Sequence, residues 1–289
     1  MAIQERTKHE STISTILVSK EQQKGRLDLG RKIKHISPFE TTIMPGSLTV
    51  AEDYLREGRG LIVPINHFSY PDPINAITAL VEASDTFNAR RILIPATLKV
   101  HKALDRVRAI DKARRIGIDV LGIMTESRKQ VVTDKHGNTI NPRALYRDYL
   151  NLSAGVLNHG GIVVLSSQGG RRERLVYKDA EKRAVDALTR WRGLDENTKL
   201  AVMPISIFYE NPDRKVNKGF NLFVRRHVVF GKTEAYEVVR DRVIEHNATT
   251  GDKTTVDEEI FRMLAANLPD SMLGEELKSI PKAAVIFAR

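Results

Sequence analysis

Short apolar runs alternate along the chain with longer segments in which apolar residues recur every three or four positions. The short runs are rich in β-branched residues and bounded by Gly or Pro, which is typical of buried strands; they cover 61–65, 91–95, 117–124, 162–165, 200–208 and 221–230. The segments with helical spacing cover 48–55, 72–81, 98–116, 144–158, 177–191, 233–247 and 255–267. This alternation predicts an α/β fold, with a mainly parallel central sheet covered by helices on both faces.

The two ends of the chain carry helical patterns outside this alternation. Ile13, Ile16 and Leu17 indicate one or two amphipathic turns before Gly25. We therefore expect an N-terminal helical cap extension over 1–45, a main domain over 46–235 and a C-terminal helical extension over 236–289. Thr254 or Thr255 is expected to cap the helix at 255–267, because acidic residues follow directly.

A histidine and a carboxylate meet at the first strand-to-helix junction of this pattern. His67 follows the strand at 61–65, and Asp72-Pro73 reads as a helix start with Asp72 as the N-cap. A carboxylate on one ring nitrogen fixes the imidazole tautomer and leaves the other nitrogen free to take a proton. The spacing thus suggests a general base, although a turn histidine beside a helix cap has the same spacing.

Glycine and arginine follow the strand at 162–165, in the sequence Gly169-Gly170-Arg171. Glycines permit close approach of the backbone to a ligand, and arginine is a bidentate donor for phosphate, so this loop has the composition of an anion site. The alternative interpretation of this segment is a glycine turn with arginines on the surface. Because parallel strands end at one edge of a sheet, His67, Arg128 and this loop, each after a predicted strand, are expected to lie close together.

The composition limits the classes of function. Lys and Arg exceed Asp and Glu by ten, which favours anionic partners, and the chain has no cysteine. Acidic residues are interspersed with the basic ones and no nucleic-acid-binding motif is present, so we expect no nucleic acid partner. No apolar stretch approaches a membrane span, and residues 1–10 lack the apolar centre of a signal peptide, so we expect a cytoplasmic protein. No metal-ligand cluster is visible, so no metal is expected.

The order of these motifs resembles that of the glycerolipid acyltransferases, which include glycerol-3-phosphate and lysophosphatidic acid acyltransferases. Their first block, Asn-His-x4-Asp, matches Asn66, His67 and Asp72. The second, a glycine six positions before an arginine, resembles Gly122 to Arg128. The third, commonly Phe-Pro-Glu-Gly-Thr-Arg, aligns with 165–171, and the fourth, an apolar strand with a proline, resembles 202–205. The resemblance covers roughly residues 48 to 232.

This chain departs from that pattern in the third block. Gln168 stands where most members have glutamate, and Ser167 and Gly170 replace the usual proline and threonine. The Gly-Gly-Arg form is closer to the soluble plastid-type glycerol-3-phosphate acyltransferases, which use acyl carrier protein. Those enzymes have a further arginine two positions later, where this chain has Glu173, and Arg174 comes one position late.

The resemblance implies transfer of an acyl group from acyl-CoA or acyl carrier protein to a hydroxyl of glycerol-3-phosphate or a lysophospholipid, without a cofactor. It also implies His67 as the base, oriented by Asp72. The residues implied in holding the acceptor phosphate are Arg128, Gly169, Gly170, Arg171, Lys99, Lys102 and Arg174, and the supporting residues are Asn66, Gln168 and Pro204. The alternative interpretation for Lys99 and Lys102 is that they lie on a solvated helix face and do not contact the acceptor.

A lipid product implies peripheral contact with an anionic membrane. Two other readings stay open. Gln168 and Glu173 allow an amine or a non-phosphorylated alcohol as the acceptor, and the charge allows a catalytically silent member that binds anionic lipid or nucleic acid.

Overall fold

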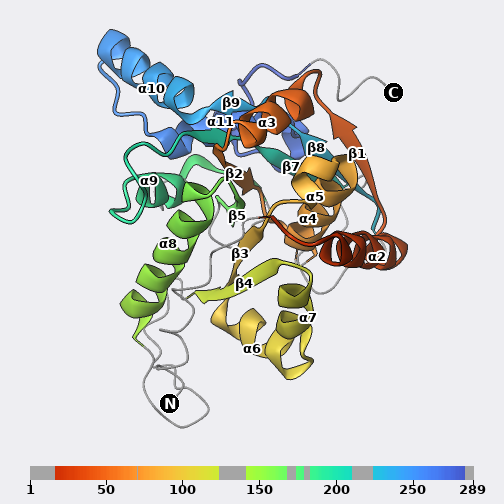
Figure 1. Cartoon of the computed structure of the whole chain (residues 1–289). Helices are drawn as coiled ribbons and strands as arrows, with labels where there is room; N and C mark the ends of the chain where they lie inside the picture. Colours follow the sequence, from red (N-terminus) through yellow and green to blue (C-terminus); the bar gives the residue numbers. More distant parts are fainter. Residues whose placement is uncertain are drawn as a thin grey trace.

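The computed structural model describes residues 17–69, 71–123, 141–167, 174–178, 183–209 and 224–283. Its strands form one open mixed sheet with helices on both faces (Figure 1). The strand order is β1-β8-β7-β2-β5-β3-β4, and β6 pairs with β2 and β9. Only the β6–β9 and β7–β8 pairings are antiparallel among the described strands, which confirms the predicted α/β fold with a mainly parallel sheet.

The strands have the following bounds: β1 Phe39–Ile43, β2 Gly60–Ile65, β3 Ile92–Thr97, β4 Ile118–Ile123, β5 Ile162–Ser166, β6 Leu200–Val202, β7 Ile205–Tyr209, β8 Arg226–Phe230 and β9 Glu234–Ala235. The helices are α2 Lys20–Ile36, α3 Ser47–Arg56, α4 Asp72–Ala83, α5 Asp85–Asn88, α6 Leu98–Arg106, α7 Ala109–Arg115, α8 Pro142–Asn158, α9 Ala184–Thr189, α10 Tyr236–Thr250 and α11 Val256–Ala265. Two 3₁₀ turns, η2 Asp270–Met272 and η3 Glu275–Leu277, follow α11.

Strand β2 is buried along its whole length because both of its faces are covered. Leu61, Val63 and Ile65 point to one side and join a core with residues of α3, α4 and α5. Ile62 points to the other side and joins a core with residues of α8, α9, α10 and α11. The continuous apolar run that predicted a buried strand therefore supplies two cores at once.

Two predicted elements are divided in the structure. The segment 98–116 forms two helices, α6 and α7, because Arg108 adopts a left-handed backbone conformation (φ 53°) between them. The segment 200–208 forms two strands, since Met203 and Pro204 interrupt it, and proline has no N–H to donate to a ladder. A third element is shorter than expected: within 177–191, the only α-helix among the described residues is α9.

The amphipathic turns predicted around Ile13, Ile16 and Leu17 lie almost entirely outside the described residues, which begin at Leu17. Helix α2 begins after a capping box formed by Ser19 and Gln22 and continues through Gly25. Gly25 allows a close approach, because a Cβ there would lie 2.7 Å from Ile116 Cγ2. Leu17 instead forms an isolated bridge with Arg90.

The terminal segments also contribute to the sheet and its cores. Residues 1–45 include β1, which pairs with β8 in parallel. Thr255 caps α11 in a capping box with Glu258, and so it is the cap among the two candidates. Within the described ranges, no helix combines the length and the apolar character needed to cross a bilayer.

Candidate functional site

The candidate site lies where β2 ends, at the carboxyl edge of the parallel strands. Strand β2 ends at Ile65, and the parallel strand β5 ends beside it, with Ile65 and Ser166 in register. His67 follows two residues after Ile65, and α4 begins at Asp72. The chain therefore turns from strand to helix within six residues and holds both side chains of the predicted pair in that turn.

Asn66 fixes the position of this turn against the neighbouring strand. Its buried side-chain amide donates to the Ile207 carbonyl at 2.7 Å, and its Oδ1 accepts from the Ile207 N–H at 2.7 Å. The side chain thus extends the contact between β2 and β7, which starts at the Ile65–Ile205 pair. Asn66, which directly precedes His67, is therefore held through both the nitrogen and the oxygen of its side-chain amide.

His67 and Asp72 are brought together as the spacing predicted. His67 Nδ1 lies 3.8 Å from Asp72 Oδ2; the imidazole is 15% exposed, whereas the carboxylate is fully buried. A solvent-accessible imidazole above a buried carboxylate has the arrangement that a general base requires. One detail differs from the prediction, since Pro71 is the N-cap and Asp72 is the first helical residue.

Four hydrogen bonds hold the Asp72 carboxylate, which turns back toward the chain before α4. Oδ2 accepts from the backbone N–H groups of Phe68 and Ser69, at 2.8 and 2.6 Å. Oδ1 accepts from the Ser69 hydroxyl at 2.8 Å and from the Tyr209 hydroxyl at 2.6 Å. Arg226 Nε lies 3.8 Å from Oδ1, and its guanidinium is also fully buried.

These contacts keep Asp72 charged in a buried place. Burial alone would raise the pKa of the Asp72 carboxyl, but its interactions with His67, Tyr209 and Ser69 outweigh burial and hold the pKa below its usual value. Burial, followed by the charge of Asp72, raises the pKa of Tyr209. Tyr209 is therefore a neutral hydroxyl that donates to Asp72.

Three residues of this site were not predicted from the sequence. Ser69 lies within the turn between β2 and α4. Tyr209 and Arg226 come from other strands and face each other in the antiparallel register of β7 and β8. Arg226 also donates to Ser37 Oγ at 2.9 Å and to the Val224 carbonyl at 2.8 Å. The only available signal for Arg226 was a pair of arginines, Arg225 and Arg226, within the apolar segment 221–230, and nothing local connected either with Asp72.

The other predicted residues within the described part of the chain lie in three places. Lys99 belongs to the first turn of α6, which follows the carboxyl end of β3, and Lys102 is exposed on the same helix. Arg174 is exposed, and its charge adds to the hydrogen bond from Lys278 that lowers the pKa of Glu275. Pro204 lies between β6 and β7, where its carbonyl accepts from the Gly231 N–H at 2.8 Å.

The remaining predicted residues, Arg128 and the loop of Gln168, Gly169, Gly170 and Arg171, lie outside the described residues. Among the described ranges, no group of three or more His, Asp or Glu side chains is arranged to hold a metal ion.

A second histidine–aspartate pair lies on the surface at the end of α10. His246 Nε2 is 3.1 Å from Asp252 Oδ2, and this carboxylate is 61% exposed. The nitrogen–oxygen distance in this pair is shorter than the 3.8 Å between His67 and Asp72, but the Asp252 carboxylate is not buried and does not have the hydrogen bonds that surround Asp72. The exposed pair is therefore a matched control for His67 and Asp72.

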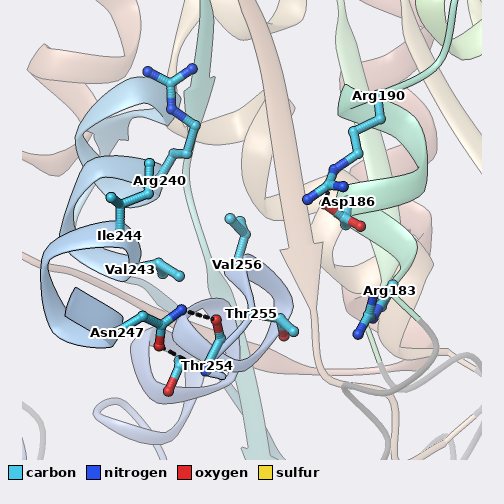
Figure 2. Close-up of a pocket in the computed structure, with 10 residues that line it drawn as sticks. All are labelled: Arg183, Asp186, Arg190, Arg240, Val243, Ile244, Asn247, Thr254, Thr255 and Val256. Carbon is cyan, nitrogen blue, oxygen red and sulfur yellow. Dashed lines mark hydrogen bonds and ion pairs between the residues drawn. The ribbon is translucent and has the colours of Figure 1, made fainter. Parts of the chain in front are cut away.

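A pocket of about 280 Å³ lies between α9, α10 and the start of α11 (Figure 2). It is lined by Arg183, Asp186, Arg190, Arg240, Val243, Ile244, Asn247, Thr254, Thr255 and Val256. Several of its polar groups bind one another: Arg190 pairs with Asp186 at 2.6 Å, and the Asn247 amide bonds the Thr254 backbone through both its oxygen and its nitrogen. In Figure 2 the three arginines point in different directions and do not converge on one point.

No family model matches the chain, and no curated protein matches it at a significant level. Of the predicted set, the structure brings His67, Asp72 and Asn66 together at one strand end and adds Ser69, Tyr209 and Arg226 to them.

Proposed function

We propose that this protein is an acyltransferase that moves an acyl group from a thioester donor to a hydroxyl of glycerol-3-phosphate or a lysophospholipid. The observation that carries the proposal is the accessible imidazole of His67, 3.8 Å from a buried carboxylate. The match of Asn66, His67 and Asp72 to the first block of the glycerolipid acyltransferases supports the same chemistry.

In this reaction His67 acts as the general base. With Nδ1 facing Asp72, the ring carries its proton on Nδ1 and offers Nε2 to the acceptor hydroxyl. As Nε2 takes that proton, the hydroxyl oxygen attacks the thioester carbonyl carbon. The carbon–sulfur bond then breaks, and the proton passes from Nε2 to the leaving thiolate, so that no proton is gained or lost.

Asp72 orients the imidazole and keeps its negative charge throughout. The contacts that lower the pKa of Asp72 also disfavour transfer of the imidazole proton to it. Its charge therefore stabilises the imidazolium that forms in the transition state.

The resemblance to the glycerolipid acyltransferases implies that Arg128 and Arg171 bind the acceptor phosphate. Lys99 and Lys102 can contribute from α6, which begins after β3 at the same edge of the sheet as His67. Binding of the phosphate would place the acceptor hydroxyl near Nε2 of His67, and this proximity would accelerate the reaction. Because the acceptor hydroxyl attacks the thioester directly in this reaction, no covalent acyl-enzyme intermediate forms.

The test measures thiol release from palmitoyl-CoA and from palmitoyl-acyl carrier protein, with glycerol-3-phosphate or lysophosphatidic acid as acceptor. We expect acceptor-dependent release that falls by at least about 100-fold in His67→Ala, the usual contribution of a general base. His246→Ala is the matched control, because it removes the histidine of the exposed pair, and it should retain wild-type activity.

Two results would contradict the proposal. Activity of His67→Ala close to that of the wild type would remove the base from the mechanism. Transfer to non-phosphorylated alcohols or amines, with none to either phosphate acceptor, would keep the acyl transfer but reject the acceptor class.

A further inference from the structure

Two neighbouring parts of the structure hold most of the net positive charge of the chain. Residues 20–36 and 98–115, which form α2 and the α6–α7 hairpin, contain thirteen Lys and Arg but four Asp and Glu. Their excess of nine compares with an excess of ten for all 289 residues. The remainder of the sequence is nearly balanced, so the charge is local.

These two parts are in contact. The Gln22 side chain on α2 donates to the Arg115 carbonyl at the end of α7 at 3.1 Å, and Arg26 donates to the Ile116 carbonyl at 2.6 Å. Figure 1 shows α2, α6 and α7 together at one side of the molecule. We call their exposed cations the basic surface; it consists of Lys20, Lys24, Arg31, Lys32, Lys34, Lys102, Arg106, Arg108, Lys112, Arg114 and Arg115.

An apolar side chain projects from this surface. Val107 is 65% exposed, more than any other large hydrophobic residue among those described. It lies at the tip of the hairpin between Arg106 and Arg108, where the left-handed conformation of Arg108 ends one helix and starts the next. The most exposed large aliphatic side chain among the described residues therefore lies between two arginines in the sequence.

This combination fits an anionic lipid surface better than a nucleic acid. Guanidinium and ammonium groups bind lipid phosphates, while an apolar tip enters the boundary between headgroups and acyl chains. Residues 20–36 and 98–115 contain no Phe, Tyr or Trp on which a nucleic acid base could stack.

We propose that the basic surface, with Val107 at its tip, docks the protein on an anionic bilayer. The inference goes beyond the proposed reaction, since it depends on charge and exposure and shares only Lys102 with the residues proposed to hold the acceptor phosphate. Helix α6 begins at the sheet edge that carries His67, and docking through the hairpin would therefore bring an element of that edge to the lipid.

The experiment is co-sedimentation of the full chain with vesicles of phosphatidylcholine, with or without about 30% phosphatidylglycerol. We expect binding to the anionic vesicles that weakens between about 0.1 and 0.5 M NaCl. The double variant Arg106→Glu/Lys112→Glu should bind at least about tenfold more weakly, and Val107→Ser about threefold more weakly.

Arg192→Glu/Arg240→Glu is the matched control. It makes the same change in net charge at exposed arginines near α9 and on α10, and it should bind like the wild type. His67→Ala should also bind like the wild type, so loss of acyl transfer and loss of docking are separate results. Circular dichroism checks that each variant is folded.

Three outcomes would overturn the inference. Wild-type protein that stays in solution with anionic vesicles lacks the docking surface. Equal loss of binding in the two double variants would make the attraction a property of net charge alone. Tighter binding to a single-stranded oligonucleotide than to vesicles, unchanged in Val107→Ser, would assign the surface to nucleic acid.

Discussion

The Asp72 carboxylate is fully buried, yet its contacts hold its pKa below the usual value, and this lowered pKa predicts a pH-dependent stability. A carboxyl with a lowered pKa stabilises the fold above its unfolded pKa of about 3.8, and this stability is lost as the pH falls through the folded value. Asp72→Asn should therefore lower the free energy of unfolding by about 3–5 kcal/mol at pH 7, because it removes a buried negative charge that accepts four hydrogen bonds and lies 3.8 Å from the buried Arg226 guanidinium. The difference from the wild type should shrink below about pH 4.

Urea unfolding at a series of pH values measures this difference. Asp252→Asn is the control, because it changes the exposed histidine–aspartate pair and should cost less than about 0.5 kcal/mol at every pH. A constant difference between Asp72→Asn and the wild type from pH 7 to the acid limit of folding would contradict the pH argument.

At the scale of elements, the sequence predicted what is local. His67 and Asp72 were found because a buried strand and a helix start are six residues apart, and both signals are short-range. Tyr209 and Arg226 could not be found in this way, since the order and register of β7 and β8 bring them to Asp72 from more than 130 residues away. The break between α6 and α7 was missed for another reason: a left-handed residue there is Arg108, with no Gly or Pro to mark it.

Helix α2 shows how one side chain can anchor an element. The buried Arg26 guanidinium donates to the carbonyls of Asn88, Arg90, Ile116 and Gly117, and so it joins α2 to the ends of α5 and α7. Burial, partly offset by the charge of Asp119, lowers the pKa of Arg26 to about 10, so it stays protonated at pH 7.

We expect Arg26→Met to lower the free energy of unfolding by about 2–4 kcal/mol, because each of several carbonyls that are at least partly buried loses a donor. Arg31→Met is the control on the same helix, where the side chain is 75% exposed, and it should change stability by less than about 0.5 kcal/mol. Chemical denaturation of both variants at pH 7 compares them. Equal effects would mean that the four carbonyl contacts contribute nothing beyond the surface arginine.

The whole molecule is built on one sheet with a core on each face, and the C-terminal helices complete one of them. Residues of α11 pack in the same cluster as Ile62 of β2, on the opposite face of that strand from Val63. Because the strand that leads to His67 lies between the two cores, loss of either core is expected to disturb the candidate site.

This arrangement predicts that α11 unfolds together with the sheet. Ile260 on α11 is fully buried, and Ile260→Ala should lower the free energy of unfolding by about 2–5 kcal/mol. Ile244→Ala on α10, where the side chain is 58% exposed, removes the same atoms and should cost less than about 0.5 kcal/mol. In Ile260→Ala, the fluorescence of Trp191, the single tryptophan, and the far-ultraviolet circular dichroism should shift to a lower midpoint together. A fluorescence transition that moves while the circular dichroism transition stays would mean that the C-terminal helices unfold separately from the sheet.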